Sequence, residues 1–189
     1  SYSVMPGSYS VRFTYGDYTK TSKFKIHSDP RHELSSELIE NKKSLLKNIH
    51  NDIDDIYSSL ERLQSAREQI LDLQSRFSSE DNYSDINELS KETIKVINGV
   101  ESSLISPKQK TFQDVINFRN QLDAQLFDLL SKVDRNIPPV TNGELERFED
   151  LHKKWMAIKS DYDKVITSVD RINKLLIEKS VPFISGGGN

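Results

Sequence analysis

The sequence predicts a mainly α fold: an elongated antiparallel bundle of about four helices, preceded by a short β-hairpin. Two patterns in the 189 residues predict it. Apolar and polar residues alternate between residues 8 and 27, as they do along a strand. After residue 30 the apolar residues recur with a period near 3.5, as they do along a packed helix. We therefore divide the chain into a hairpin over 1–30, a helical bundle over 31–184 and a flexible, glycine-rich tail over 185–189.

The predicted hairpin pairs residues 8–15 with residues 18–27 around a two-residue turn, Gly16-Asp17. A two-residue loop that begins with glycine matches the twist of paired strands. With Tyr15 opposite Tyr18, apolar side chains from both strands lie on one face. This face is the candidate interaction face, and its residues are Tyr9, Val11, Phe13, Tyr15, Tyr18, Phe24 and Ile26.

An isolated two-stranded ribbon is only marginally stable in water, so something has to cover the aromatic face. Lys20, Lys23 and Lys25 could form a basic strip that binds a partner. Lysines on an edge strand more often prevent edge-to-edge pairing of sheets, however. We favour this protective role.

The three-four spacing of apolar residues predicts the helices. The first is expected over about 34–77, with a buried stripe of Leu38, Leu45, Ile49, Ile53, Ile56, Leu60, Leu63, Ile70 and Leu73 or Phe77. Ser84 is the expected N-cap of the second helix, which ends before Pro107. Its stripe consists of Ile86, Leu89, Thr93, Ile97, Val100 and Leu104.

The third helix is expected to start near Thr111, with Asp114 completing a capped helix start. Its stripe consists of Val115, Phe118, Leu122, Leu126, Leu129 and Val133. Thr141 and Glu144 form a capping box that starts the fourth helix. The stripe of the fourth helix has no break in its steps of three and four, and comprises Phe148, Leu151, Trp155, Ile158, Tyr162, Val165, Val169, Ile172 and Leu176.

The first and fourth helices would reach beyond about 50 Å at 1.5 Å per residue, so the bundle is a rod. The second and third are about half as long. They could lie end to end or form two separate legs, and we favour two legs. Residues 1–31 carry five Lys/Arg and two Asp/Glu, a net charge of +3, which leaves 21 against 27, or −6, for the remainder. This acidity is typical of solvated helix faces.

Composition excludes several function classes. The net charge of −3 lacks the basic excess of a nucleic-acid-binding protein, and no apolar run approaches the ~20 residues of a membrane span. Without cysteine, no disulfide or cysteine-based zinc site can form. Phosphate-binding glycine loops, zinc-binding His-Glu helices and serine nucleophile elbows do not occur in the sequence.

One cluster, His50 with Asp52, Asp54 and Asp55, resembles an acid-base or metal site. On a helix His50 and Asp54 share a face while the other two carboxylates point elsewhere, which favours a solvated surface. His152, beside two lysines, has an ordinary structural explanation, as does Trp155 in its apolar stripe, where core packing is expected. We therefore predict no catalytic, cofactor-binding or metal-binding residue, and no cofactor.

A resemblance to a known family rests on three short segments: PGSYSVRFTYG at 6–16, FKI at 24–26 and DPR at 29–31. They resemble the C-terminal region of large exported bacterial proteins with sortilin-like, BNR-repeat β-propellers, often labelled glycosyl hydrolases. In that family the hairpin forms the last strands of an immunoglobulin-like sandwich and leads into a bundle of long helices. The helices here match by length and order alone.

The resemblance implies that residues 1–30 are the remnant of a sandwich domain in a fragment of a longer, exported protein, in the periplasm, at the cell surface or secreted. The implied partners are the upstream propeller and sandwich domains of the same chain, with a protein partner or self-association through the hairpin as further options. The aromatic face would then pack on the helices or be covered by another copy. No active-site residue of the family can be carried over. The expected role is a non-catalytic accessory, spacer or protein-interaction module.

Two alternatives stay open. Regular heptads also occur in intracellular coiled-coil or spectrin-like scaffolds, which should leave an apolar stripe free for a partner helix. An accessory module should instead bury its stripes within itself. A hydrolase in its own right is the second alternative, disfavoured because the sequence shows no convergent catalytic constellation.

Overall fold

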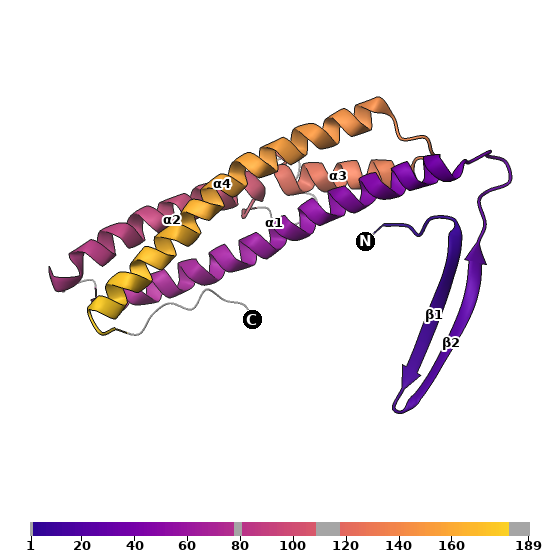
Figure 1. Ribbon diagram of the computed structural model, residues 1–189. Helices are drawn as coiled ribbons and strands as arrows, with labels where there is room; N and C mark the ends of the chain where they lie inside the picture. The colour runs from indigo at the N-terminus through magenta and orange to yellow at the C-terminus, as the bar shows by residue number, and fades with distance from the viewer. Residues whose placement is uncertain (1, 78–80, 109–117, 182–189) are drawn as a thin grey trace.

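The computed structural model describes residues 2–77, 81–108 and 118–181, and it confirms the predicted fold class (Figure 1). An antiparallel hairpin of β1 (Gly7–Tyr15) and β2 (Tyr18–Ile26) is followed by the helices. These are α1 (Ser36–Phe77), α2 (Ser84–Leu104), α3 (Leu122–Arg135) and α4 (Asn142–Glu178), with a 3-10 helix (Asp81–Tyr83) before α2. The tail predicted over 185–189 lies outside the described residues.

The two long helices begin at side-chain caps. The N–H of Leu38 donates to Ser35 Oγ (3.2 Å) and starts α1. The predicted capping box of α4 is confirmed: Glu144 N–H donates to Thr141 Oγ1 (3.2 Å), and Thr141 N–H donates to Glu144 Oε2 (2.8 Å). Each cap satisfies backbone donors that the first turn of a helix leaves free, which fixes where the rod begins.

α2 and α3 lie end to end and run antiparallel to α1. Gln74 near the end of α1 donates to the Asn87 carbonyl of α2 (3.4 Å), whereas Tyr57, nearer its start, donates to Asp123 of α3 (3.1 Å). α4 runs parallel to α1, and both extend along the rod (Figure 1). Most levels of the rod thus contain α1, α4 and either α2 or α3, in place of the two separate legs that the sequence favoured. The 21 residues of α2 and 14 of α3 together match the 37 of α4.

Two predicted helix starts differ from the structure. α3 begins at Leu122, and Phe118 lies in a bend before it, because the backbone at Gln121 is extended (φ −80°, ψ −173°). Thr111, Asp114 and Val115 lie outside the described residues. Ser84 is the first helical residue of α2 and not its N-cap. The cap position belongs to Tyr83, which ends the 3-10 helix and makes no side-chain capping hydrogen bond.

The predicted apolar stripes form the core of the rod. Trp155, Leu46, Ile49, Ile56 and Leu126 are among its most deeply buried side chains. Most members of every stripe that the structure describes are buried, while a few near the helix ends or at the stripe edges are half-buried: Leu38, Phe77, Leu89, Phe148 and Ile158. Core packing of Trp155 is confirmed. The apolar stripes of the helices therefore pack against one another.

Two buried charged residues that the sequence did not single out connect the helices. The Lys42 ammonium in α1 donates to the Asp134 carbonyl (2.9 Å) and to the Asn136 carbonyl at the end of α3. Burial lowers the pKa of Lys42. Cations favour helix C-termini, where carbonyls lack intrahelical donors, so Lys42 caps α3 from a neighbouring helix.

Glu101 in α2 is held by Arg67 and Gln64 of α1. The Arg67 guanidinium pairs with its Oε2, and Gln64 Nε2 donates to its Oε1 (2.9 Å). Burial alone would raise the pKa of Glu101, but these hydrogen bonds outweigh burial and the pKa is lowered. The carboxylate is therefore stabilised in its charged form.

Replacing Lys42 with methionine should lower the free energy of unfolding by about 1–3 kcal/mol, because the two carbonyls lose a buried charged donor. Chemical denaturation followed by circular dichroism measures this loss. The matched control is Lys43→Met, which removes an exposed lysine paired only with Glu40 and should cost less than about 1 kcal/mol. Equal losses in the two variants would contradict the capping role.

Replacing Glu101 with glutamine should destabilise the chain in a pH-dependent way. Because its pKa is lower when folded, the carboxylate contributes stability above its unfolded value near 4.5, and this contribution is lost as the pH falls through the folded pKa. The difference between wild type and variant should be about 1–3 kcal/mol at neutral pH and shrink in acid. The exposed Glu92→Gln is the control, and a difference that grows in acid would refute this assignment.

Candidate functional site: the aromatic face of the hairpin

The strand register that the sequence predicts is confirmed, and it places the residues of the candidate interaction face on one side of the hairpin. The register pairs Tyr15 with Tyr18, Val11 with Ser22 and Tyr9 with Phe24, and directly opposed side chains project to the same side. Gly16 has φ +55° and Asp17 does not have positive φ, which is the glycine-first turn that the sequence indicates. Ile26, the last member of the face, pairs with Gly7 at the base of the hairpin and is half-buried.

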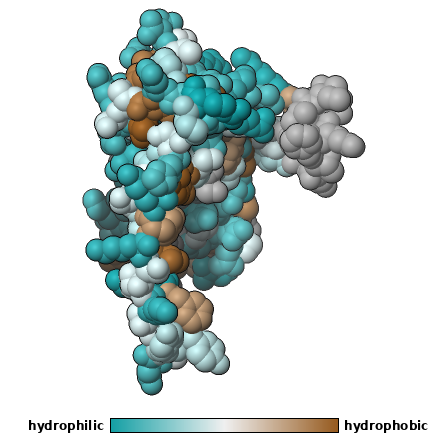
Figure 2. Space-filling model, turned by 90° about the vertical axis from the view of Figure 1, so that its right-hand side faces the viewer, coloured by the Kyte–Doolittle hydropathy of each residue, from teal (hydrophilic) through white to brown (hydrophobic). Residues whose placement is uncertain are grey.

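The helices do not cover this face, contrary to one of the two options that the sequence left. The hairpin projects away from the rod (Figure 1), and Figure 2 shows it extending beyond the helices as a narrow ribbon. Five residues of the face are largely exposed, the four nearest the turn and Phe24 nearer the base: Val11 by 55%, Phe13 by 60%, Tyr15 by 79%, Tyr18 by 58% and Phe24 by 48%. Contiguous apolar surface of this kind is typical of an interaction site.

Charge is divided unequally between the two sides of the ribbon. Arg12, Lys23 and Lys25 project from the side opposite the aromatic face, and this opposite side has no acidic residue in the paired strands. Lys20 is the one charged residue of the paired strands on the aromatic side, opposite Phe13. The ribbon thus has a cationic side and an aromatic side.

The base of the hairpin is held by contacts between its own residues and by one contact with the core of the rod. Tyr9 and Phe24 stack with ring centroids 5.9 Å apart, and the Tyr9 hydroxyl donates to the Met5 carbonyl (2.6 Å). Met5 is buried among the core residues. The aromatic face is therefore half-buried at its base and becomes exposed toward the turn.

The segment before β1 binds the end of the rod where α1 and α3 meet. Both the N–H and the hydroxyl of Ser3 donate to the Asp134 carboxylate at 2.9 Å. The ring of Tyr2 meets His50 edge-on, with centroids 5.7 Å apart. The hairpin is thus attached on its entry side by contacts with two helices.

On its exit side, the segment Asp29-Pro30-Arg31 forms a compact turn. Asp29 Oδ1 accepts from the Arg31 N–H (2.9 Å), and the Arg31 guanidinium donates to both oxygens of the same carboxylate. These hydrogen bonds lower the pKa of Asp29 to about 2. This turn connects the hairpin to α1, so the three residues have a local structural role.

The histidine and acidic residues that the sequence singled out lie on α1 and α4. His50 Nε2 lies 3.5 Å from Asp54, as predicted from their shared face. Asp52 and Asp55 point away from His50, as predicted, but they face α4 in place of the predicted solvated surface, and Asp52 is buried. Asp52 Oδ2 lies 2.8 Å from His152 Nδ1, and Asp55 accepts from the Trp155 indole (3.1 Å) and from Lys159. Sequence reasoning missed these contacts. The separations of 100 to 104 residues in these contacts were a usable signal only once α1 and α4 were known to be parallel.

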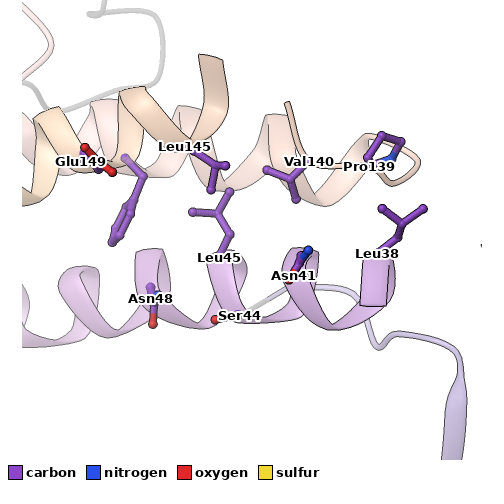
Figure 3. Close-up of a pocket in the computed structure, with 10 residues that line it drawn as sticks. Leu38, Asn41, Ser44, Leu45, Asn48, Pro139, Val140, Leu145 and Glu149 are labelled. Carbon is purple, nitrogen blue, oxygen red and sulfur yellow. The ribbon is translucent and has the colours of Figure 1, made fainter. Parts of the chain in front are cut away.

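A groove of about 490 Å³ lies between α1 and the start of α4 (Figure 3). Leu45, Val140 and Leu145 project into the groove from its two sides, and Asn41 and Asn48 line it on the side of α1. Its lining is mostly apolar with amide and hydroxyl groups at the edge, and it contains no histidine. It does not include any residue of the aromatic face.

Comparison with known proteins gave no match: no protein-family model, no curated protein and no solved structure is significantly similar to this chain. Within the described residues, no helix has the length and apolar character needed to cross a membrane. Those residues also contain no group of three or more His, Asp or Glu side chains arranged to hold a metal ion.

Replacing Phe13, Tyr15 and Tyr18 together with serine should leave helix stability within about 0.5 kcal/mol of wild type, because these side chains lie outside the core. At low protein concentration the wild type should bind anilinonaphthalene sulfonate, a dye for exposed apolar surface, and the variant should lose most of the fluorescence. The control replaces Thr14, Thr19 and Thr21, on the opposite side, with serine. Equal dye binding by both variants would contradict an exposed aromatic site.

Proposed function

We propose that this chain is a non-catalytic accessory module of a larger exported bacterial propeller protein, which acts as a spacer and binds protein through its hairpin. The observation that carries the proposal is the exposed aromatic face, held away from a rod that buries its own apolar stripes. The sequence resemblance to the region that follows propeller and sandwich domains supplies the context.

The rod suits a spacer. α1 has 42 residues, which correspond to about 60 Å at 1.5 Å per residue. The hairpin lies at one end of this length (Figure 1). Binding at the hairpin would therefore set the far end of the rod at a fixed separation from the partner.

The chemistry of the face favours a partner with a flat apolar surface of its own. Sheets pack face to face at about 10 Å through interdigitating side chains. A ribbon with aromatic residues on one side and Arg12, Lys23 and Lys25 on the other can present only its aromatic side to such a partner. The sandwich domain expected upstream has surfaces of this type.

The burial pattern supports the accessory role over the scaffold. A coiled-coil scaffold should leave an apolar stripe free for a partner helix, and the stripes of α1, α2 and α4 are mainly buried within the rod. The exposed apolar residues of α4 are Leu145, Met156, Ile166 and Ile177, which are about three turns apart and separated by charged residues. They do not form a continuous seam.

A photoreactive residue in place of Tyr15, in the full-length polypeptide expressed in cells that produce it, tests the proposal. Cross-links from this position should greatly exceed those from a matched probe at Thr14, which projects from the opposite side of β1. Mass spectrometry of the linked peptides identifies the partner surface.

Equal cross-linking from both positions would refute the aromatic face as the binding surface. The non-catalytic part of the proposal has a separate test. Hydrolysis of a glycan or peptide substrate by the purified 189-residue chain, abolished by Asp52→Asn, would refute it.

A further inference from the structure

We propose that the partner of the aromatic face is the same face of a second copy of this chain, with the two hairpins stacked and their turns pointing in opposite directions. This inference rests on the proposed function and gives the interaction face a specific occupant. It follows from the size of the exposed surface and from the distribution of charge.

The exposed area is sufficient for a dimer. Val11, Phe13, Tyr15, Tyr18 and Phe24 are 48–79% exposed. Because an aromatic side chain can bury about 150–250 Å², these residues expose roughly 500 Å² together. Two copies that cover one another would bury about 1,000 Å², which is the lower bound for a specific protein interface. A patch of this size is comparable to the largest apolar patch of a typical soluble monomer, about 300–600 Å², and such patches are often functional.

The charges of the ribbon favour stacking over edge-to-edge pairing. In a stack, the side that carries Arg12, Lys23 and Lys25 faces solvent in both copies. Lateral pairing would leave both aromatic faces uncovered, and the lysines of β2 oppose pairing at that edge. Lys20 lies on the aromatic side but on β2, an edge strand, so its aliphatic stem can lie on the face while its ammonium reaches water.

The charges of the whole chain favour two stacked hairpins that point in opposite directions. Residues 1–31 have a net charge of +3 and the remainder −6. Hairpins stacked in the same direction would bring two acidic rods together at one end. In opposite directions the rods are separated by the length of a nine-residue strand, about 30 Å, which exceeds the ~10 Å range of screened charge. The cationic hairpin of each copy then approaches the acidic rod of the other.

The strand register predicts where the two-fold axis passes. The middle of β1 is Val11, which pairs with Ser22 in the middle of β2. With full overlap of opposed hairpins, the axis passes beside this pair, so Ser22 of one copy lies over the same region of the other. Thr21 projects from the opposite side and remains remote from its counterpart.

Sedimentation velocity of the purified chain from about 1 to about 200 µM tests the dimer. Wild type should shift from monomer to dimer over this range. Val11→Glu, opposite the uncharged Ser22, places an unpaired charge inside the stack and should weaken dimerisation at least about 100-fold. The matched control Thr14→Glu adds the same charge on the solvent side of β1 and should leave dimerisation intact. A wild type that stays monomeric, or equal effects of the two variants, would overturn the proposal.

The absence of cysteine allows a second measurement that adds no charge to the hairpin. Under mild oxidation, Ser22→Cys should form disulfide-linked dimers, whereas Thr21→Cys should form few. Equal rates would overturn the stacked arrangement. If the chain is monomeric but Tyr15 still cross-links to another domain, the dimer alone fails. If neither occurs, the proposed function fails with it.

Discussion

Burial of the apolar stripe of α1 is the constraint on which the rest of the structure depends. Isolated helices of the length of α2 or α3 are marginal in water, so their stability comes from packing on a partner. α1 provides that partner along 42 residues, to α3 along its first part and to α2 along its second. With α4 parallel to it, α1 also brings residues that are 100 apart to the same level of the rod. Asp52 meets His152 and Asp55 meets Trp155 for this reason.

The hairpin has the opposite constraint, because a two-stranded ribbon has no interior in which to bury a side chain. Its base overcomes this by stacking Tyr9 on Phe24 and by holding Met5 against the core, while its outer half has no such support within the chain. Exposure of the aromatic residues nearest the turn to water is therefore unfavourable. Exposed apolar patches of this kind usually mark binding sites. The proposal of an interaction role rests on this contrast between a rod that buries its own apolar stripes and a ribbon whose aromatic residues are exposed.

Features governed by local chemistry were predictable from the sequence. The strand register, the glycine-first turn at Gly16, the capping box at Thr141 and the helical stripes depend on residues close together in the chain. The start of α3 was not predictable, since Phe118 fits the helical spacing and only the extended backbone at Gln121 excludes it. Contacts such as Asp52 with His152 require the alignment of two distant helices, which no period specifies. The side of the ribbon on which the residues of the candidate site lie was predictable from the register, but their exposure depends on where the whole ribbon points.

The attachment of the hairpin to the rod has a mechanical consequence. A ribbon joined by one flexible link would swivel, and force at its tip would only reorient it. Here the incoming chain is tied through Ser3 to Asp134 of α3, whereas the outgoing chain passes through the turn at Asp29 and Arg31 and then through residues 32–35 before α1 begins at Ser36. The contacts on the entry side join the ribbon to α3 through Ser3 and to α1 through Tyr2, so a pull on β1 is transmitted to two helices at once.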